Sequence, residues 1–157
     1  MLLKNNRHNR PLYYTGYIGS THIERIQVDP GSALSIILKR LLYFLGIPLS
    51  RLLTMTTTIY GFNAGSSHPL GKIRLRYQIG DLKLEVVCYI IDAETSYNLL
   101  LGRPWIHANW IVPFTLHQYF KYVDDKAMVR TVFAEMQPFK GWRTTSPILY
   151  FIKRTIN

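Results

Sequence analysis

One carboxylate in the first half of the sequence is placed where it could do chemistry. Up to residue 80 the chain has only two acids, Glu24 and Asp29. Asp29 ends a run rich in apolar residues, and Pro30, Gly31 and Ser32 follow it. Such a turn would hold the carboxylate rigid and exposed. An Asp-Pro-Gly sequence is by itself more often only a turn, because these residue types favour turns for backbone reasons. The elements around Asp29 must show whether it is a catalytic carboxylate or only part of a turn.

The residues on both sides of Asp29 predict a hairpin and a short helix. Residues 13–18 and 21–28 are rich in Tyr, Ile and Thr, and they flank Gly19-Ser20, a pair that suits a two-residue turn. Asp29 therefore stands at the end of a strand. Residues 36–45 have apolar side chains at the i, i+3, i+4 spacing of a helix face, and a glycine follows them. We expect one short helix there.

The middle of the chain predicts further strands. Residues 54–62 are rich in Thr, and residues 63–67 supply turn residues before another strand at 70–79. Residues 82–91 end in an unbroken apolar run, which predicts a strand buried on both faces. Together with the first hairpin, these short strands predict an all-β domain with little helix.

A short helix is expected after the last of these strands. Pro104 fits the first position of a helix over residues 105–110. That segment carries Trp105 and Trp110, which we interpret as anchors in the core and not as a platform for a ligand.

The order of these motifs resembles the retropepsins, in particular the aspartic protease domains in gag-pol polyproteins of gypsy-type long-terminal-repeat retrotransposons. The resemblance covers roughly residues 12–110. Asp29-Pro30-Gly31 is similar to the family's Asp-Thr/Ser-Gly signature, and the hairpin at 59–73 is similar to its flap. Leu100-Leu101-Gly102-Arg103 is similar to the motif that packs beneath its active site. The resemblance implies a small closed β-barrel with a flap hairpin and one or two short helices.

The resemblance also implies roles for individual residues. Asp29 would be the catalytic carboxylate, and its loop would be supported by Pro30, Gly31 and Ser32. The flap would contain Tyr60, Gly61, Phe62, Asn63 and Gly65. The residues that would support the active site or the dimer are Leu100, Leu101, Gly102 and Arg103.

The chemistry implied by Asp29 needs a second carboxylate. Peptide hydrolysis of this kind uses one carboxylate as a base on water and one carboxylic acid to polarise the carbonyl. Two carboxyls about 3 Å apart share one proton and fill both roles. Asp29 lies in the only Asp-x-Gly of the sequence. The second carboxylate must therefore come from another copy across a two-fold axis, which makes the expected enzyme a homodimeric aspartic endopeptidase.

The expected substrate is an extended peptide, bound as an added strand. The resemblance implies that this peptide is part of a retrotransposon polyprotein, processed in the cytoplasm or within virus-like particles. Pro30 departs from the family pattern, which has a Thr or Ser hydroxyl that bonds across the dimer. Proline has neither hydroxyl nor N–H, although its fixed φ stiffens the turn. The first alternative is therefore a catalytically impaired remnant that only dimerises or binds peptides.

A second alternative is a nucleic-acid-binding module, because the formal net charge is +10. The nineteen Lys and Arg are spread along the chain without a dense basic run or a known nucleic-acid motif. Lys72, Arg74 and Arg76 alternate with apolar residues, which places them on one strand face, and we interpret that face as solvated. The sequence therefore does not predict nucleic acid as a partner.

Composition indicates one domain in a chain of 157 residues, of which 48% are hydrophobic and 18% charged. We expect a basic arm at 1–11, the protease domain at 12–112, and a linker or partly ordered tail at 113–157, where the periodicity is lost. No apolar stretch approaches the roughly 20 residues that span a bilayer, so no membrane partner is predicted. Cys88 is the only cysteine and is interpreted as a buried strand thiol. The five histidines lack ligand spacing, so neither a metal nor a cofactor is predicted.

Overall fold

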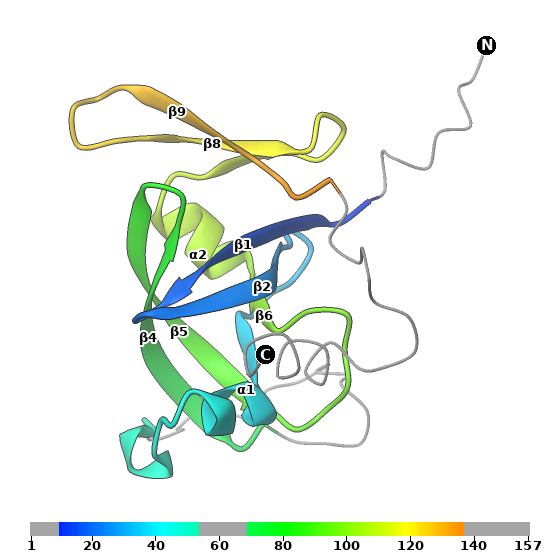
Figure 1. Cartoon of the computed structure of the whole chain (residues 1–157). Coiled ribbons are helices and arrows are strands. Elements are labelled where there is room, and N and C mark those ends of the chain that lie inside the picture. The colour runs from blue at the N-terminus through cyan, green and yellow to red at the C-terminus, as the bar shows by residue number, and fades with distance from the viewer. Residues whose placement is uncertain (1–9, 54–68, 137–157) are drawn as a thin grey trace.

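Six strands close into a barrel in the order β1-β2-β6-β3-β5-β4 (Figure 1). The computed structural model describes residues 10–53 and 69–136. The barrel strands are β1 (Leu12–Ile18), β2 (Thr21–Val28), β3 (Ile36–Leu38), β4 (Gly71–Ile79), β5 (Leu82–Ile91) and β6 (Leu99–Leu101). Short helical segments are α1 (Lys39–Phe44), η2 (Leu49–Arg51) and α2 (Arg103–Ala108). The closed barrel with few short helices confirms the fold class expected from the sequence.

The first hairpin forms as predicted. β1 pairs antiparallel with β2, and Gly19 turns the chain with a φ of 60°, in the left-handed region that glycine adopts at little cost. The register shifts between Tyr14 and Gly16, and beyond this point β1 also pairs with β4, at Tyr17 and Ile18. A Cβ added at Gly16 would lie 2.2 Å from the carbonyl oxygen of Gln78, so only glycine permits this close approach.

The segment predicted as one helix at 36–45 is a strand followed by a helix. Its first three residues form β3, which is buried and pairs parallel with β5 and antiparallel with β6. Only Lys39–Phe44 is helical. The helical spacing of the apolar residues was real, but sheet hydrogen bonds with two distant strands outweigh that local pattern in β3.

β4 and β5 form a long antiparallel pair, from Gly71 opposite Ile90 to Ile79 opposite Leu82. On β4 the apolar residues point into the core, and Lys72, Arg74 and Arg76 share the outer face, as the alternation predicted. The prediction that β5 is buried on both faces is wrong. Val87 is 39% exposed, and Lys83 and Glu85 on the same strand face are exposed as well.

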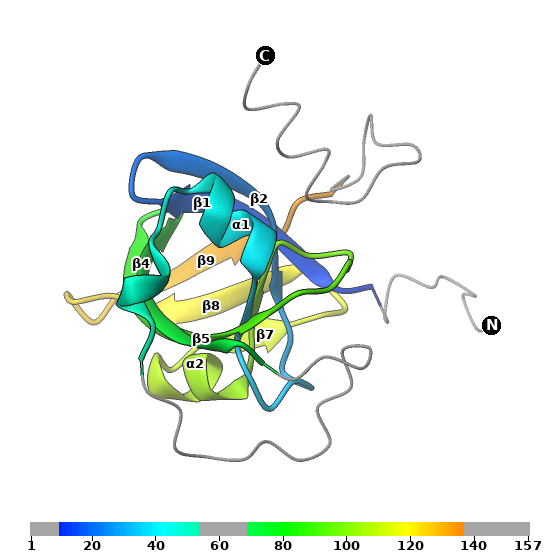
Figure 2. The same cartoon turned by 90° about the horizontal axis from the view of Figure 1, so that it is seen from below.

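The chain beyond residue 113 continues as ordered sheet up to Phe133, in contrast to the linker or partly ordered tail expected from its sequence. β7 (Val112–Phe114), β8 (Tyr119–Val123) and β9 (Val129–Phe133) form an antiparallel sheet in that order. Figures 1 and 2 show this sheet at one end of the barrel and α1 at the other. Phe120 is fully buried, with its ring 4.9 Å from that of Tyr14. Phe120 therefore joins the added sheet to the barrel core.

The two tryptophans near α2 have different environments. Trp105 is buried, with its ring 5.9 Å from Tyr77, as expected of a core anchor. Trp110 is 82% exposed, so its interpretation as a core anchor is wrong. The helix begins at Arg103 after Gly102, which places Pro104 at the second helical position and not the first. Starting there, the short helix ends before Trp110 and does not direct that ring inward.

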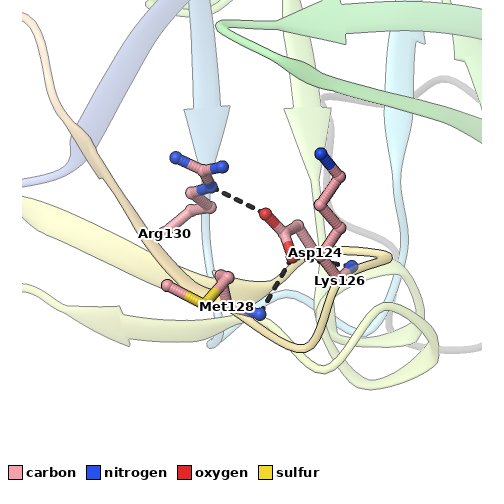
Figure 3. A network of polar contacts seen from close by, with 4 residues as sticks. All are labelled: Asp124, Lys126, Met128 and Arg130. Carbon is pink, nitrogen blue, oxygen red and sulfur yellow. Dashed lines mark hydrogen bonds and ion pairs between the residues drawn. The ribbon is translucent and has the colours of Figure 1, made fainter.

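Asp124 closes the turn between β8 and β9 (Figure 3). Its Oδ1 accepts hydrogen bonds of 2.9 Å from the backbone N–H groups of Lys126 and Met128. Its Oδ2 accepts a 2.7 Å bond from Nε of Arg130. The bond from Arg130, followed by the bonds from the backbone, lowers the pKa of Asp124 below its ordinary value.

One further sequence prediction concerns Cys88. Cys88 is buried within β5, as predicted, and burial raises the pKa of its thiol. Several predicted segments lie outside the described residues: residues 1–9 of the arm, the strand at 54–62, the tip of the flap, and the tail from 137. Within the described part of the chain, no helix has the length and hydropathy needed to cross a membrane.

Candidate active site

Asp29 lies directly after β2, beside the end of β6. β2 and β6 run parallel, with Val28 opposite Leu101. The backbone N–H of Asp29 continues this pairing with a 2.9 Å hydrogen bond to the carbonyl oxygen of Leu101. Because parallel strands end on the same side, the first candidate motif is placed against the second, Leu100-Leu101-Gly102-Arg103.

The turn after Asp29 holds one of its carboxylate oxygens in place. The N–H of Ser32 donates to the Asp29 carbonyl at 3.2 Å, with the exposed Pro30 inside this turn. The N–H of Gly31 donates to Asp29 Oδ1 at 2.8 Å. Among the described residues, none donates a hydrogen bond to Oδ2. The half-exposed carboxylate thus has one fixed oxygen and one oxygen available to water or a second carboxyl.

Gly102 crosses beneath this loop at very short range. A Cβ at Gly102 would lie 2.2 Å from the carbonyl oxygen of Leu34 and 2.8 Å from that of Ser32. The N–H of Gly102 donates to Ser35 Oγ at 3.0 Å, and the N–H of Arg103 donates to the carbonyl of Ser32 at 2.8 Å. These bonds fix the Asp29 loop to the start of α2, and the short distances to the two carbonyl oxygens explain why this position needs glycine.

The other residues predicted to support the site lie in different parts of the structure. Leu100 and Leu101 are buried in β6 under the loop. Ser32 Oγ donates to the carbonyl oxygen of Leu34 at 2.7 Å, so its hydroxyl braces its own loop. Arg103 is exposed at the start of α2. The flap residues Tyr60, Gly61, Phe62, Asn63 and Gly65 lie outside the described residues.

Three residues of the site were not singled out from the sequence. Ser35 is buried, and besides accepting from Gly102 its carbonyl accepts from the N–H of Tyr89 on β5 at 2.9 Å. Asn98 is buried, and its Nδ2 donates to the carbonyl of Glu24 at 2.7 Å, which ties the start of β6 to β2. Ser35 and Asn98 could have been predicted from the sequence, because each lies within a few residues of one of the two motifs.

Tyr97 is the third of these residues and lies close enough to Asp29 to sense its charge. Burial, followed by the negative charge of Asp29, raises the pKa of Tyr97 to about 12. The phenol is therefore neutral at physiological pH. Tyr97 therefore adds no negative charge near Asp29.

Comparison with solved structures identifies the fold. No protein-family model matches the sequence, and no curated protein matches it. The structure is similar to the retroviral protease-like domain of Ddi1 from Leishmania major, with a TM-score of 0.56 and 18% identity over 78% of this chain and 94% of that one. The chain has the retropepsin-like fold. A retropepsin-like aspartic protease from Rickettsia conorii is also similar, with a TM-score of 0.50 and 17% identity over 79% of this chain and 84% of that one.

The retropepsin-like fold agrees with the placement of the two motifs found in the sequence. Asp29 is at the end of a barrel strand, and Gly102 packs under its loop. At these identities the likeness shows the fold.

Proposed function

We propose that this chain is an aspartic endopeptidase whose active site is completed by Asp29 of a second copy. The observation that carries the proposal is the geometry of Asp29. Its Oδ1 is held by the N–H of Gly31 at 2.8 Å, while Oδ2 accepts no hydrogen bond from the described residues. Gly102 lets the backbone pack directly beneath this loop, and the half-exposed carboxylate keeps one oxygen for a second carboxyl.

The second carboxyl has to approach this free oxygen. With two copies of Asp29 about 3 Å apart, one proton is shared, because two charges at that distance repel too strongly. The ionised member takes a proton from water, and the protonated member donates to the substrate carbonyl. A two-fold axis beside Asp29 provides this arrangement with one gene product.

Pro30 supports the same loop in a different way from the hydroxyl residue of the family pattern. It lies inside the turn closed by Ser32 and Asp29, where its ring fixes φ near −65°. The ring stiffens the turn from within each copy, but it gives no hydrogen bond to the partner. This missing bond favours the second candidate function, a retropepsin-fold remnant that dimerises or binds peptides without turnover.

The proposed substrate is an extended peptide, held as an added strand over the paired Asp29 residues. The hairpin predicted at 59–73 would be the flap over this peptide, with Tyr60 to Gly65 at its tip. The proposed natural substrate is the polyprotein of a gypsy-type retrotransposon, cleaved in the cytoplasm or within virus-like particles.

A test of the active site compares Asp29→Asn with Asp81→Asn in a peptide-library cleavage assay. Asp81 is an exposed acid in the turn between β4 and β5, so its variant makes the same chemical change away from the site. We expect Asp29→Asn to fold and dimerise without hydrolysis, and Asp81→Asn to cleave at the wild-type rate. Cleavage by Asp29→Asn at the wild-type rate would refute the proposal.

Concentration and mixing test the shared site. Dilution separates the copies, so specific activity should fall with protein concentration. Excess Asp29→Asn added to wild type should reduce activity through mixed dimers, and a pepstatin-like transition-state mimic should block cleavage. The rate should rise and then fall with pH, because one of the two carboxyls must keep a proton and the other must lose it. Dimers that bind peptide without any turnover would identify the remnant instead.

A further inference from the structure

A cavity of about 650 Å³ opens on the barrel surface, away from the loop of Asp29. It lies between the β1–β2 turn, the segment after α1, and the outer face of β4. Its apolar wall includes Leu45 and Ile47, and three arginines also line it, Arg51, Arg74 and Arg76. Arg51 comes from η2 and the other two from β4, so only the fold brings the three together.

A second cavity, of about 610 Å³, adjoins the first. Both are lined by Gly19, Arg76 and Glu85, so they lie side by side at the β1–β2 turn and β4. The second cavity adds the cation Lys83 and the ring of Tyr17, which is 46% exposed. We call this surface, from Arg51 through Arg74 and Arg76 to Lys83, the basic groove.

The basic groove has an excess of positive charge. Arg76 is paired with Glu85, with 2.9 Å between Nε and Oε1, and Glu85 is the one acid that lines either cavity in the described part of the chain. Arg51, Arg74 and Lys83 are exposed and form no ion pair with other described residues. Arg74 and Arg76 are two residues apart on one strand face, a spacing of about 7 Å. Lys83 on β5 lies opposite Gln78, two residues beyond Arg76, so Arg74, Arg76 and Lys83 follow one another along the sheet.

We propose that the basic groove binds single-stranded nucleic acid through its phosphates. One guanidinium group donates two parallel hydrogen bonds to the oxygens of one phosphate. A row of such groups therefore suits a linear chain of phosphates. The exposed ring of Tyr17 offers a face on which a base stacks. The formal net charge of +10 attracts a phosphate polymer from a distance. This binding is separate from peptide hydrolysis, because none of the residues of the basic groove belongs to the Asp29 loop or to β6.

The sequence did not predict this partner because its cations are spread along the chain. The tertiary structure places Arg51, from another segment, against the row on β4. An acidic polypeptide is the other polyanion to consider. It would use the same arginines, but it would give the exposed Tyr17 ring no base to stack on.

The experiment measures fluorescence anisotropy of a labelled single-stranded oligonucleotide of mixed sequence with the full chain, over a series of salt concentrations. The groove variants are Arg51→Glu and Arg74→Glu. The control is Lys126→Glu, which makes the same change in net charge at an exposed turn between β8 and β9. We expect each groove variant to weaken binding by about tenfold and to reduce the slope of log K against log salt by about 0.7, the value for one phosphate contact of a single strand.

Two more variants separate charge from stacking. Glu85→Gln removes the carboxylate of the basic groove and should strengthen binding. Tyr17→Ala should weaken binding while leaving the salt slope unchanged, because stacking releases no counterions. Circular dichroism checks that each variant folds, and Arg51→Gln and Arg74→Gln replace any charge reversal that does not.

Three outcomes would overturn the proposal. The first is a loss of binding in Lys126→Glu as large as in the groove variants, which would show an effect of net charge alone. The second is competition by poly-L-glutamate equal to that of unlabelled oligonucleotide, which would indicate a site for acidic polypeptides. The third is that the oligonucleotide does not bind at low salt, or that its binding does not weaken as salt is added.

Discussion

The N–H of Gly31 donates a 2.8 Å hydrogen bond to Oδ1 of Asp29, two residues before it. A Cβ at Gly31 would lie 3.1 Å from that same oxygen. Gly31 therefore donates a hydrogen bond to the carboxylate of Asp29 and also leaves space for its oxygen. Glycine is the residue that meets both conditions without displacing the Asp29 side chain.

Gly31→Ala should lower peptidase activity more than it lowers stability. The added methyl group must push Oδ1 by a few tenths of an ångström, and misplacement of a reacting group costs roughly tenfold to a hundredfold in rate. The backbone at Gly31 is not in the left-handed region, so the free energy of unfolding should change by less than about 1 kcal/mol. Peptide kcat/KM and urea unfolding measure the two effects.

The control for that variant is Gly80→Ala. Gly80 has a φ of 59°, and the nearest atom to an added Cβ is 4.0 Å away. This change should destabilise the chain by about 1 kcal/mol through backbone strain and leave kcat/KM unchanged. If Gly31→Ala kept full activity, the bond to Asp29 Oδ1 would not position the carboxylate.

Gly102→Ala should cause a large loss of stability. The added Cβ would meet backbone oxygens of Leu34 at 2.2 Å and Ser32 at 2.8 Å, and backbone cannot rotate away as a side chain can. We expect the free energy of unfolding to fall by about 2 kcal/mol or more. Gly71→Ala is the matched comparison, because its Cβ would touch only the flexible Leu52 side chain at 3.4 Å. Equal urea midpoints for the two variants would contradict the close packing under the loop.

Arg103→Lys should weaken dimerisation and leave the single chain intact. The Arg103 side chain is exposed and forms no hydrogen bond with other described residues, so its planar fork is free to pair with a carboxylate or carbonyls at the base of a dimer. Sedimentation equilibrium should show a weaker dimer, while urea unfolding of dilute protein stays unchanged. Arg40→Lys, at an exposed pair with Glu94, should alter neither measurement. If dimerisation is unaffected by Arg103→Lys, this role for Arg103 is wrong.

The β8–β9 turn should lose stability in acid. The pKa of Asp124 is lowered in the folded chain, first by the bond from Arg130, so its stabilising contribution is present above the ordinary carboxyl pKa and is lost as pH falls through the lowered value. Asp124→Asn removes this charge and should reduce the loss of thermal stability between neutral pH and strong acid. Thermal midpoints of both proteins over that range provide the measurement. Identical pH profiles would show that the Arg130 bond does not contribute.

The sequence by itself determined the elements whose signals are local. Gly19-Ser20 and the flanking β-formers specified the first hairpin, and the alternation on β4 specified which residues face out. The position of Asp29 at the end of a strand followed from the same pattern. Such signals are readable because turn geometry and the two-residue period of a strand depend only on neighbouring residues.

Only the tertiary structure decided the features that depend on distant partners. Ile36–Leu38 became a strand because β5 and β6 lie on its two sides, although its spacing suits a helix. Gly102 needs glycine because the carbonyls of Ser32 and Leu34 cross above it. Arg51 and Arg74 line one cavity because the fold brings η2 against β4. These contacts join residues far apart in the chain, and their energies have no counterpart in any local pattern of the sequence.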